Sequence, residues 1–121
     1  MIINGSAQSK ADDRIVLLWE NPDTTVSFDP QTITLDTNNH PVFLITCKLT
    51  TELDEYMTVP ILNTTDVTGQ YIRIGVSVKH ASRKVEVVEE GLKFAYALST
   101  TNSNVSTDNS CNIPYRIYGL Y

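Results

Sequence analysis

The stretch "QYIRIGVSVK" (residues 70–79) decides the fold class, because its apolar residues alternate with polar or small residues without interruption. A period of two over nine residues is typical of a β-strand that buries one face and exposes the other. No stretch of the chain shows a convincing period of 3.6, the period of an amphipathic helix. The alternating apolar positions are Ile72, Ile74, Val76 and Val78.

Similar stretches on both sides are separated by clusters of turn-forming residues. They are residues 14–20, 31–35, 42–50, 56–62, 82–90, 92–99 and 113–121. Pro60 has no backbone donor, so its strand is expected at an edge or with a bend. In 92–99 we expect Leu92, Phe94, Tyr96 and Leu98 on one face, with a short helix as the less favoured alternative. About eight strands without crossover helices predict an antiparallel β-sandwich that is jelly-roll-like.

Two connections carry specific expectations. Residues 80–82 are of hairpin length, which places His80 at a hairpin tip, and His40 precedes a proline in a turn, so both imidazoles are expected in solvent. Residues 100–112 form a polar stretch that is long for a loop, and long loops in small domains are often functional. Its candidate outward residues are Asn102, Asn104, Asp108 and Asn109.

The length of 121 residues fits one domain, with residues 1–13 as an N-terminal arm or connector and residues 14–121 as a single β-sandwich domain. The net charge of −5 argues against a nucleic-acid partner. No basic run and no long apolar segment predicts membrane association, and the first residues do not resemble a secretory signal. We therefore expect a protein made in a cytoplasm.

Side chains that could carry chemistry are few. Cys47 and Cys111 have no metal-site spacing, and free thiols are favoured over a disulfide. Acidic clusters at residues 12–13, 52–55 and 86–90 could hold calcium or supply a glycosidase pair, but solvated strand faces and turns account for them more simply. We expect no catalytic residue, no cofactor and no metal, and hence no enzyme.

The aromatic residues are expected either to pack in the core or to form a contact surface for a partner. Trp19 is expected as a buried anchor, with a carbohydrate-stacking platform as the alternative. Tyrosines left on the outer side of a packed strand would form an exposed patch, which usually marks an interface. Tyr71 belongs to this group, and the candidate oligomer interface at the C-terminus consists of Tyr115, Tyr118 and Tyr121.

Two stretches resemble the ends of small C-terminal β-domains of bacteriophage tail and fibre-like proteins. "LLWENPDTTVSFDPQTITLD" (residues 17–36) resembles their LWxNP…F..QTI opening, and "DNSCNIPYRIYGLY" (residues 108–121) resembles their ending, IPxxIYG[IL]. The matching positions are Leu18, Trp19, Asn21, Pro22, Phe28, Gln31, Thr32, Ile33, Leu35, Cys111, Ile113, Pro114, Ile117, Tyr118, Gly119 and Leu120.

This resemblance implies a virion structural protein, located in a fibre, in the tail or as decoration of the head. It also implies a homo-oligomer, most simply a homotrimer, with other virion proteins as partners and contact with a host surface glycan or protein as a receptor. A carbohydrate-binding, lectin-like module without an assembly role is the alternative function.

Overall fold

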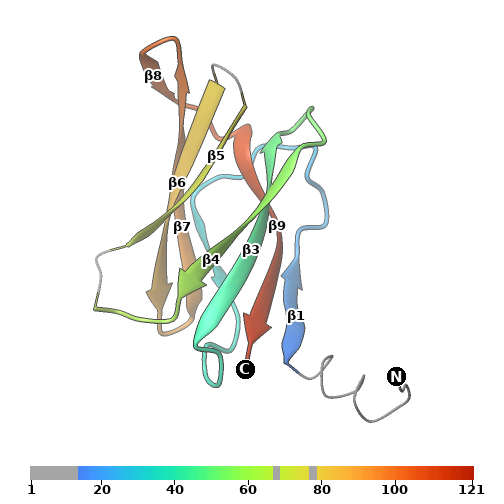
Figure 1. The fold of residues 1–121 in the computed structure, drawn as a ribbon, viewed down its shortest axis with the longest axis vertical. Coiled ribbons are helices and arrows are strands. Elements are labelled where there is room, and N and C mark those ends of the chain that lie inside the picture. The colour runs from blue at the N-terminus through green and yellow to red at the C-terminus, as the bar shows by residue number, and fades with distance from the viewer. Residues whose placement is uncertain (1–13, 67–68, 77–78) are drawn as a thin grey trace.

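The computed structural model describes residues 14–66, 69–76 and 79–121, and its regular structure over these ranges consists of β-strands. Two antiparallel sheets pack face to face, which confirms the expected β-sandwich (Figure 1). Within the same ranges there is no helix long and apolar enough to cross a membrane. The expected arm or connector at residues 1–13 lies outside the described residues.

The first sheet, called sheet A, contains in spatial order β1 (Ile15–Glu20), β9 (Cys111–Leu120), β3 (Val42–Thr50) and β4 (Tyr56–Leu62). The second, sheet B, contains β2 (Gln31–Thr34), β7 (Gly91–Thr101), β6 (Lys79–Val88) and β5 (Gln70–Val76). The short strand β8 (Asn104–Thr107) pairs with β7 beside β2. Pro60 lies in β4, an edge strand, as its missing donor predicts.

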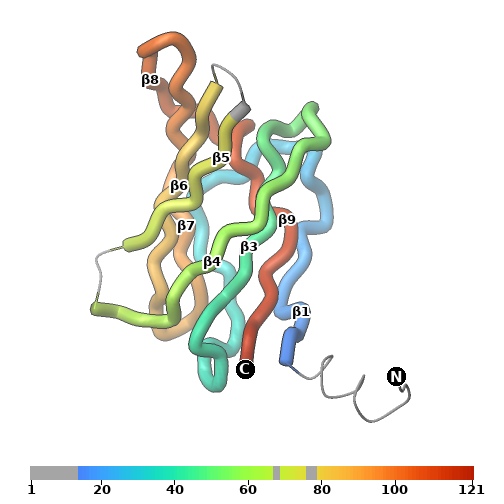
Figure 2. The backbone as a smooth tube through the Cα atoms, in the orientation of Figure 1, coloured from blue at the N-terminus to red at the C-terminus, as the bar shows by residue number. Residues whose placement is uncertain are grey.

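The chain crosses between the two sheets after β1, β2, β4 and β8, and Figure 2 traces these crossings along the backbone. The first strands of the chain are therefore interleaved with the last strands in both layers, which is a jelly-roll-like winding. In sheet A, β9 lies between β1 and β3, so the C-terminal strand is central.

Inward-facing side chains from both sheets form one apolar core, as alternation along each strand requires. Phe28, in the connection between β1 and β2, packs edge-on against Trp19 and Phe94, with ring centroids 6.1 and 5.6 Å away. Trp19 packs against the core, as expected of an anchor, but it is half-buried and not fully buried. The buried members are Phe28, Ile33, Phe43, Ile45, Cys47, Ile61, Ile72, Val85, Leu92, Phe94, Ile113 and Ile117.

Three bulges interrupt the regular pairing of the strands and change which side chains face the core. In β1, Leu18 is the extra residue, because Leu17 pairs with Tyr118 while Trp19 pairs with Ile117. In β7, residues 95 and 96 together oppose the single residue 84 of β6. The expectation that Tyr96 and Leu98 share a face with Phe94 is therefore wrong, and Ala97 and Ser99 are buried instead. In β9, residue 115 is the extra residue, because Arg116 pairs with Thr46 while Pro114 pairs with Cys47. A bulge reverses the alternation beyond it, which a regular period of two does not reveal.

Both expected connections are also corrected. Residues 80–82 belong to β6, whose register pairs Val76 with Lys79, so the connection of this hairpin lies at residues 77–78, outside the described part. The expected loop of residues 100–112 is the end of β7, a two-residue turn, β8, a short connection at residues 108–110 and the start of β9. Asn102 and Ser103 in that turn have φ values of 50° and 75°, as in the type I′ turns that favour hairpins.

Candidate functional site

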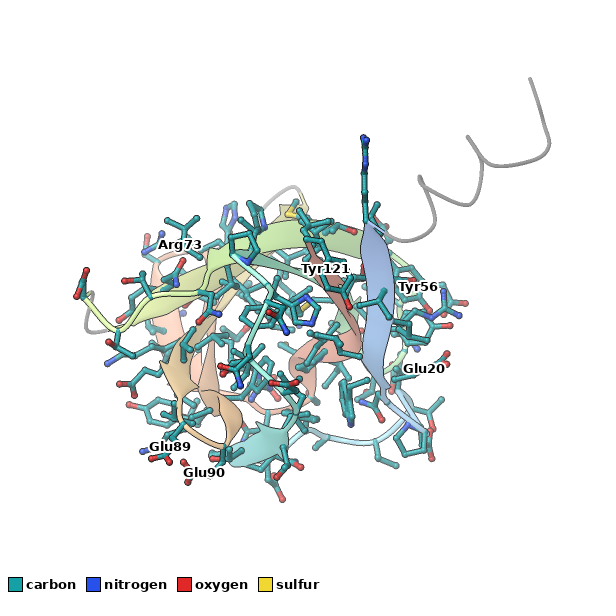
Figure 3. All side chains as sticks on the ribbon, turned by 90° about the horizontal axis from the view of Figure 1, so that it is seen from below. Glu20, Tyr56, Arg73, Glu89, Glu90 and Tyr121 are labelled. Atoms are coloured by element: carbon teal, nitrogen blue, oxygen red, sulfur yellow. The ribbon has the colours of Figure 1, made fainter. Side chains whose placement is uncertain are left out.

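Within residues 14–66, 69–76 and 79–121, the titratable side chains do not converge on a metal centre. Among the described residues, no three His, Cys, Asp or Glu side chains are grouped as metal ligands. His80 is exposed, as expected, but His40 is 5% exposed, so the expectation of a solvated His40 is wrong. Glu89 and Glu90 project from the turn between β6 and β7, in agreement with a solvated acidic cluster (Figure 3). The candidate sites are therefore surfaces.

Part of the outer side of sheet A is covered by uncharged, mostly apolar side chains, and we call this part the apolar face. Its residues are aligned by the register in two rows that each cross all four strands. One row is Ile15, Leu120, Val42 and Leu62, and the other is Leu17, Tyr118, Leu44 and Pro60. Ile15, Leu17 and Leu62 are 49%, 47% and 56% exposed. Apolar side chains in such a continuous arrangement usually mark an interaction surface.

A polar row borders the apolar face on one side. Arg116 donates a hydrogen bond from Nε to Glu20 over 3.1 Å, and the hydroxyl groups of Thr46 and Thr58 lie 2.9 Å apart. These polar groups already form hydrogen bonds with one another. The border is therefore polar, but most of its hydrogen-bonding groups have partners within the chain. Beyond it, the guanidinium carbon of Arg116 lies 4.4 Å from the ring centroid of Tyr115.

The three tyrosines of the predicted oligomer interface have different surroundings. Tyr118 is half-buried within the apolar face. Tyr115 is directed outward by its bulge and contacts the ring of Tyr56, with centroids 5.4 Å apart. Tyr121 is 61% exposed and lies against the ring of His40 at the end of the sandwich. Only Tyr118 therefore belongs to the apolar face itself.

The outer side of sheet B has a different character. A hollow of about 450 Å³ lies between Tyr71 of β5, Lys84 of β6 and Tyr96 of β7, and its remaining lining residues are Ser82, Glu86, Lys93, Ala95 and Leu98. We call this hollow the tyrosine–lysine groove. Tyr71 and Tyr96 are 47% and 51% exposed, so each ring offers surface to a ligand. Figure 3 shows Arg73, beside this groove, on the opposite side of the molecule from Tyr56 of sheet A.

The register explains how the groove is built. Tyr71 pairs with Lys84, and Lys84 faces the bulge that contains Tyr96, so the three side chains lie in one row across three strands. Adjacent strands are about 4.8 Å apart, which places the backbones that carry the two tyrosines about 10 Å apart. The carbon chain of Lys84 passes over Gly69, where a Cβ atom would lie only 2.2 Å from Cε.

A second hollow of about 380 Å³ continues the groove along the same strands and shares Ser82 with it. Its lining residues include Arg73, Gly75, His80 and Thr100. The guanidinium carbon of Arg73 lies 4.9 Å from the ring centroid of Tyr71, so this cation is held over an aromatic face next to the groove.

The four residues predicted to lie in an outward loop fall into two pairs. Asn102 and Asn104 are exposed at the β7–β8 turn, which projects at one end of the sandwich (Figure 1). Asp108 and Asn109 are half-buried and hold the backbone: the Asn109 side chain accepts from the amide of Ala97 over 2.9 Å. The hydroxyl of Ser110 donates to the Asp108 carboxylate and holds its pKa below the usual value.

Comparison of the chain with protein-family models, with curated proteins and with solved structures finds no match. The two surfaces must therefore be interpreted from their own geometry. Sequence reasoning singled out Tyr71 and Tyr118 but missed Tyr96 and Lys84, because only the bulge in β7 brings them together. The alternation along residues 42–44 and 118–120 indicates apolar side chains on the outer side of these two strands, but only the register shows that they continue across all four strands.

Proposed function

We propose that this chain is a structural protein of a bacteriophage virion, a surface module of a fibre, of the tail or of the head. In this proposal it assembles with copies of itself and with other virion proteins, and it has no catalytic activity. The observation that carries the assembly role is the apolar face, whose two rows contain no charged side chain.

Charge supports a second copy of the chain as the occupant of this face. With a net charge of −5, two copies repel each other over most of their surfaces. The apolar face is an uncharged region where two copies can approach without bringing carboxylates together. Sheets also pack naturally face to face at about 10 Å through rows of apolar side chains.

The assignment to a virion is supported by the resemblance of residues 17–36 and 108–121 to phage tail and fibre-like domains. These two stretches are distant in the sequence but meet in one ladder, in which Trp19 pairs with Ile117. The side chain of Asn21 also donates to the carbonyl of Pro114 over 2.9 Å. Most matching positions therefore lie in one structural unit, the β1–β9 pair with its flanking turn, whereas Gln31, Thr32 and Ile33 lie in β2 of sheet B.

Symmetry connects the face to the number of subunits. If the same face meets itself, the contact is isologous and gives a two-fold dimer. The homotrimer implied by the resemblance would instead direct three apolar faces toward a common axis. In both arrangements the tyrosine–lysine groove, on the opposite sheet, stays accessible to a host surface molecule.

The assembly role is tested by light scattering coupled to size-exclusion chromatography at several concentrations. We expect the mass of a dimer or trimer for the natural chain and of a monomer for Leu17→Glu, because the new carboxylate lies in the apolar face. Val105→Glu is the matched control, since Val105 is 62% exposed on β8 of the other sheet. A natural chain that stays monomeric at high micromolar concentration contradicts the assembly role.

Genes for tail or capsid proteins beside this gene would support the virion assignment.

The tyrosine–lysine groove favours a second candidate function, a carbohydrate-binding module. Two half-exposed tyrosines beside polar side chains form a surface on which sugar rings can stack, because aromatic rings supply rigid apolar area with little loss of entropy. This function requires no assembly, and a fibre module that contacts a host glycan would combine both functions. Saturable binding to a glycan array, lost in Tyr96→Ala, tests it.

A further inference from the structure

We propose that the tyrosine–lysine groove binds an acidic sugar of a polysaccharide, with the ring stacked on Tyr96 and the acidic group held by Lys84 and Lys93. This inference rests on the second proposed function, glycan binding, and adds the chemical class of the ligand. It is independent of the assembly role, which concerns the opposite sheet.

The first argument is the local excess of positive charge. The chain as a whole has 9 Lys and Arg against 14 Asp and Glu. The two hollows on sheet B are lined by three cationic residues, Arg73, Lys84 and Lys93, and by one carboxylate, that of Glu86. An acidic ligand is therefore attracted to this surface and repelled by most of the rest of the molecule.

The second argument is that these cations are not neutralised within the part of the chain that is described. The ion pairs found there join Lys48 to Asp54 and Arg116 to Glu20. Glu86 and Lys93 are opposite each other on β6 and β7 but are not among these ion pairs. Lys84 and Lys93 can therefore bind a carboxylate or phosphate without first breaking an ion pair with another described residue.

The third argument concerns shape and order. Lys84 lies in the row between Tyr71 and Tyr96, and Gly69 leaves the space that its carbon chain occupies. The groove has two tyrosine rings, and Arg73 is stacked on that of Tyr71. Among the described contacts, no cation lies over the other ring, that of Tyr96. A sugar ring on Tyr96 would bring an acidic substituent toward Lys84 and Lys93, while Glu86 can accept a hydrogen bond from a sugar hydroxyl.

A single acidic group could belong to a uronic acid or to a phosphate-bearing sugar polymer, and the shared chemistry is an anion attached to a polyhydroxylated chain. Three probes separate the contributions in calorimetric titrations of the full chain. Oligogalacturonate carries sugar and charge, a glycerol phosphate polymer carries phosphate on a polyol without sugar rings, and dextran carries sugar without charge.

We expect saturable binding of oligogalacturonate that weakens as salt rises, because the charges are exposed and screened. Tyr96→Ala should weaken binding about two- to tenfold, the usual range for an aromatic contact. Lys93→Gln should also weaken it and should reduce its salt dependence. The matched controls are Tyr56→Ala, which removes an exposed tyrosine from β4 of sheet A, and Arg14→Gln, which removes an exposed positive charge just before β1. Both should bind like the natural chain. Circular dichroism verifies that each variant is folded.

Each alternative outcome has a defined meaning. If the glycerol phosphate polymer binds more tightly and its binding still depends on Tyr96, the ligand of the groove is acidic, as proposed, and its acidic group is a phosphate. Equal binding of dextran would retain the glycan function and overturn the acidic class. Binding of both anionic probes without any effect of Tyr96→Ala would show attraction by charge alone and overturn the site. No binding of any probe would reject both the site and the glycan function.

Discussion

Arg83 Nε donates a hydrogen bond of 3.0 Å to the carbonyl oxygen of Asn112 and thereby joins β6 of sheet B to β9 of sheet A. Asn112 returns a bond in the opposite direction, from its side-chain amide to the carbonyl of Ile72 over 2.8 Å. Both residues are 0% exposed, so the two sheets are joined through the core by hydrogen bonds as well as by apolar packing.

Replacement of Arg83 by Met should strongly destabilise the domain. The guanidinium also donates to the carbonyls of Ala95 and Cys111, over 2.7 and 3.1 Å, so three acceptors lose their donor. At about 1 kcal/mol or more for each such acceptor, we expect a loss of at least about 3 kcal/mol in the free energy of unfolding. Burial lowers the pKa of Arg83 to about 10, which leaves the group charged at neutral pH.

Denaturant titration measures this loss, and Arg73→Met serves as the control. Arg73 is exposed, and removal of its side chain should change the free energy of unfolding by less than about 0.5 kcal/mol. Equal stability of Arg83→Met and the natural chain would show that the bonds between the sheets contribute nothing net.

Replacement of Gly119 by Ala should destabilise the domain through His40. A Cβ atom at position 119 would lie 2.6 Å from His40 Nδ1, so the ring would have to move away. Overpacking of this kind costs about 1–3 kcal/mol. In a His40→Ala background the same change should cost much less, and a double-mutant cycle measures the difference. An equal cost in both backgrounds would mean that the strain has another origin.

Deletion of the last six residues should abolish the fold. Residues 116–121 include half of β9, which pairs with β1 on one side and with β3 on the other. Their loss would leave both neighbours with unpaired backbone groups and remove Ile117 from the core. We expect no cooperative thermal transition. Deletion of Tyr121 alone, which is 61% exposed, should leave a cooperative transition at a slightly lower temperature.

Both cysteines should remain unreactive in the native protein. They are free and buried, and burial raises the pKa of Cys47 to about 12 and also raises that of Cys111. Since the thiolate is the reactive form, a disulfide reagent at pH 8 should label neither thiol before the chain unfolds. Rapid labelling of one thiol in the folded protein would show that its part of the core opens easily.

The sequence predicts the position and the buried face of a strand where buried and exposed residues alternate regularly along it. Strands β3 and β4 have the predicted bounds, residues 42–50 and 56–62, because both are regular between clear turn clusters. Strand β8 was missed, since all four of its residues are exposed and only its pairing with β7 defines it. Of the candidate sites, Tyr71 and Tyr118 were anticipated, but the groove and the apolar face needed the register.

The sequence by itself determined the all-β class and most strand positions, because a period of two is a local property that follows from the backbone geometry of a strand. The tertiary structure alone decided where that period is broken, and hence that Tyr96 faces solvent beside Lys84. It also decided that His40 and Arg83 are buried, since their partners come from β9, about 30 or more residues away in the sequence. Contacts between distant strands leave no periodic signal, and both surfaces proposed for function depend on them.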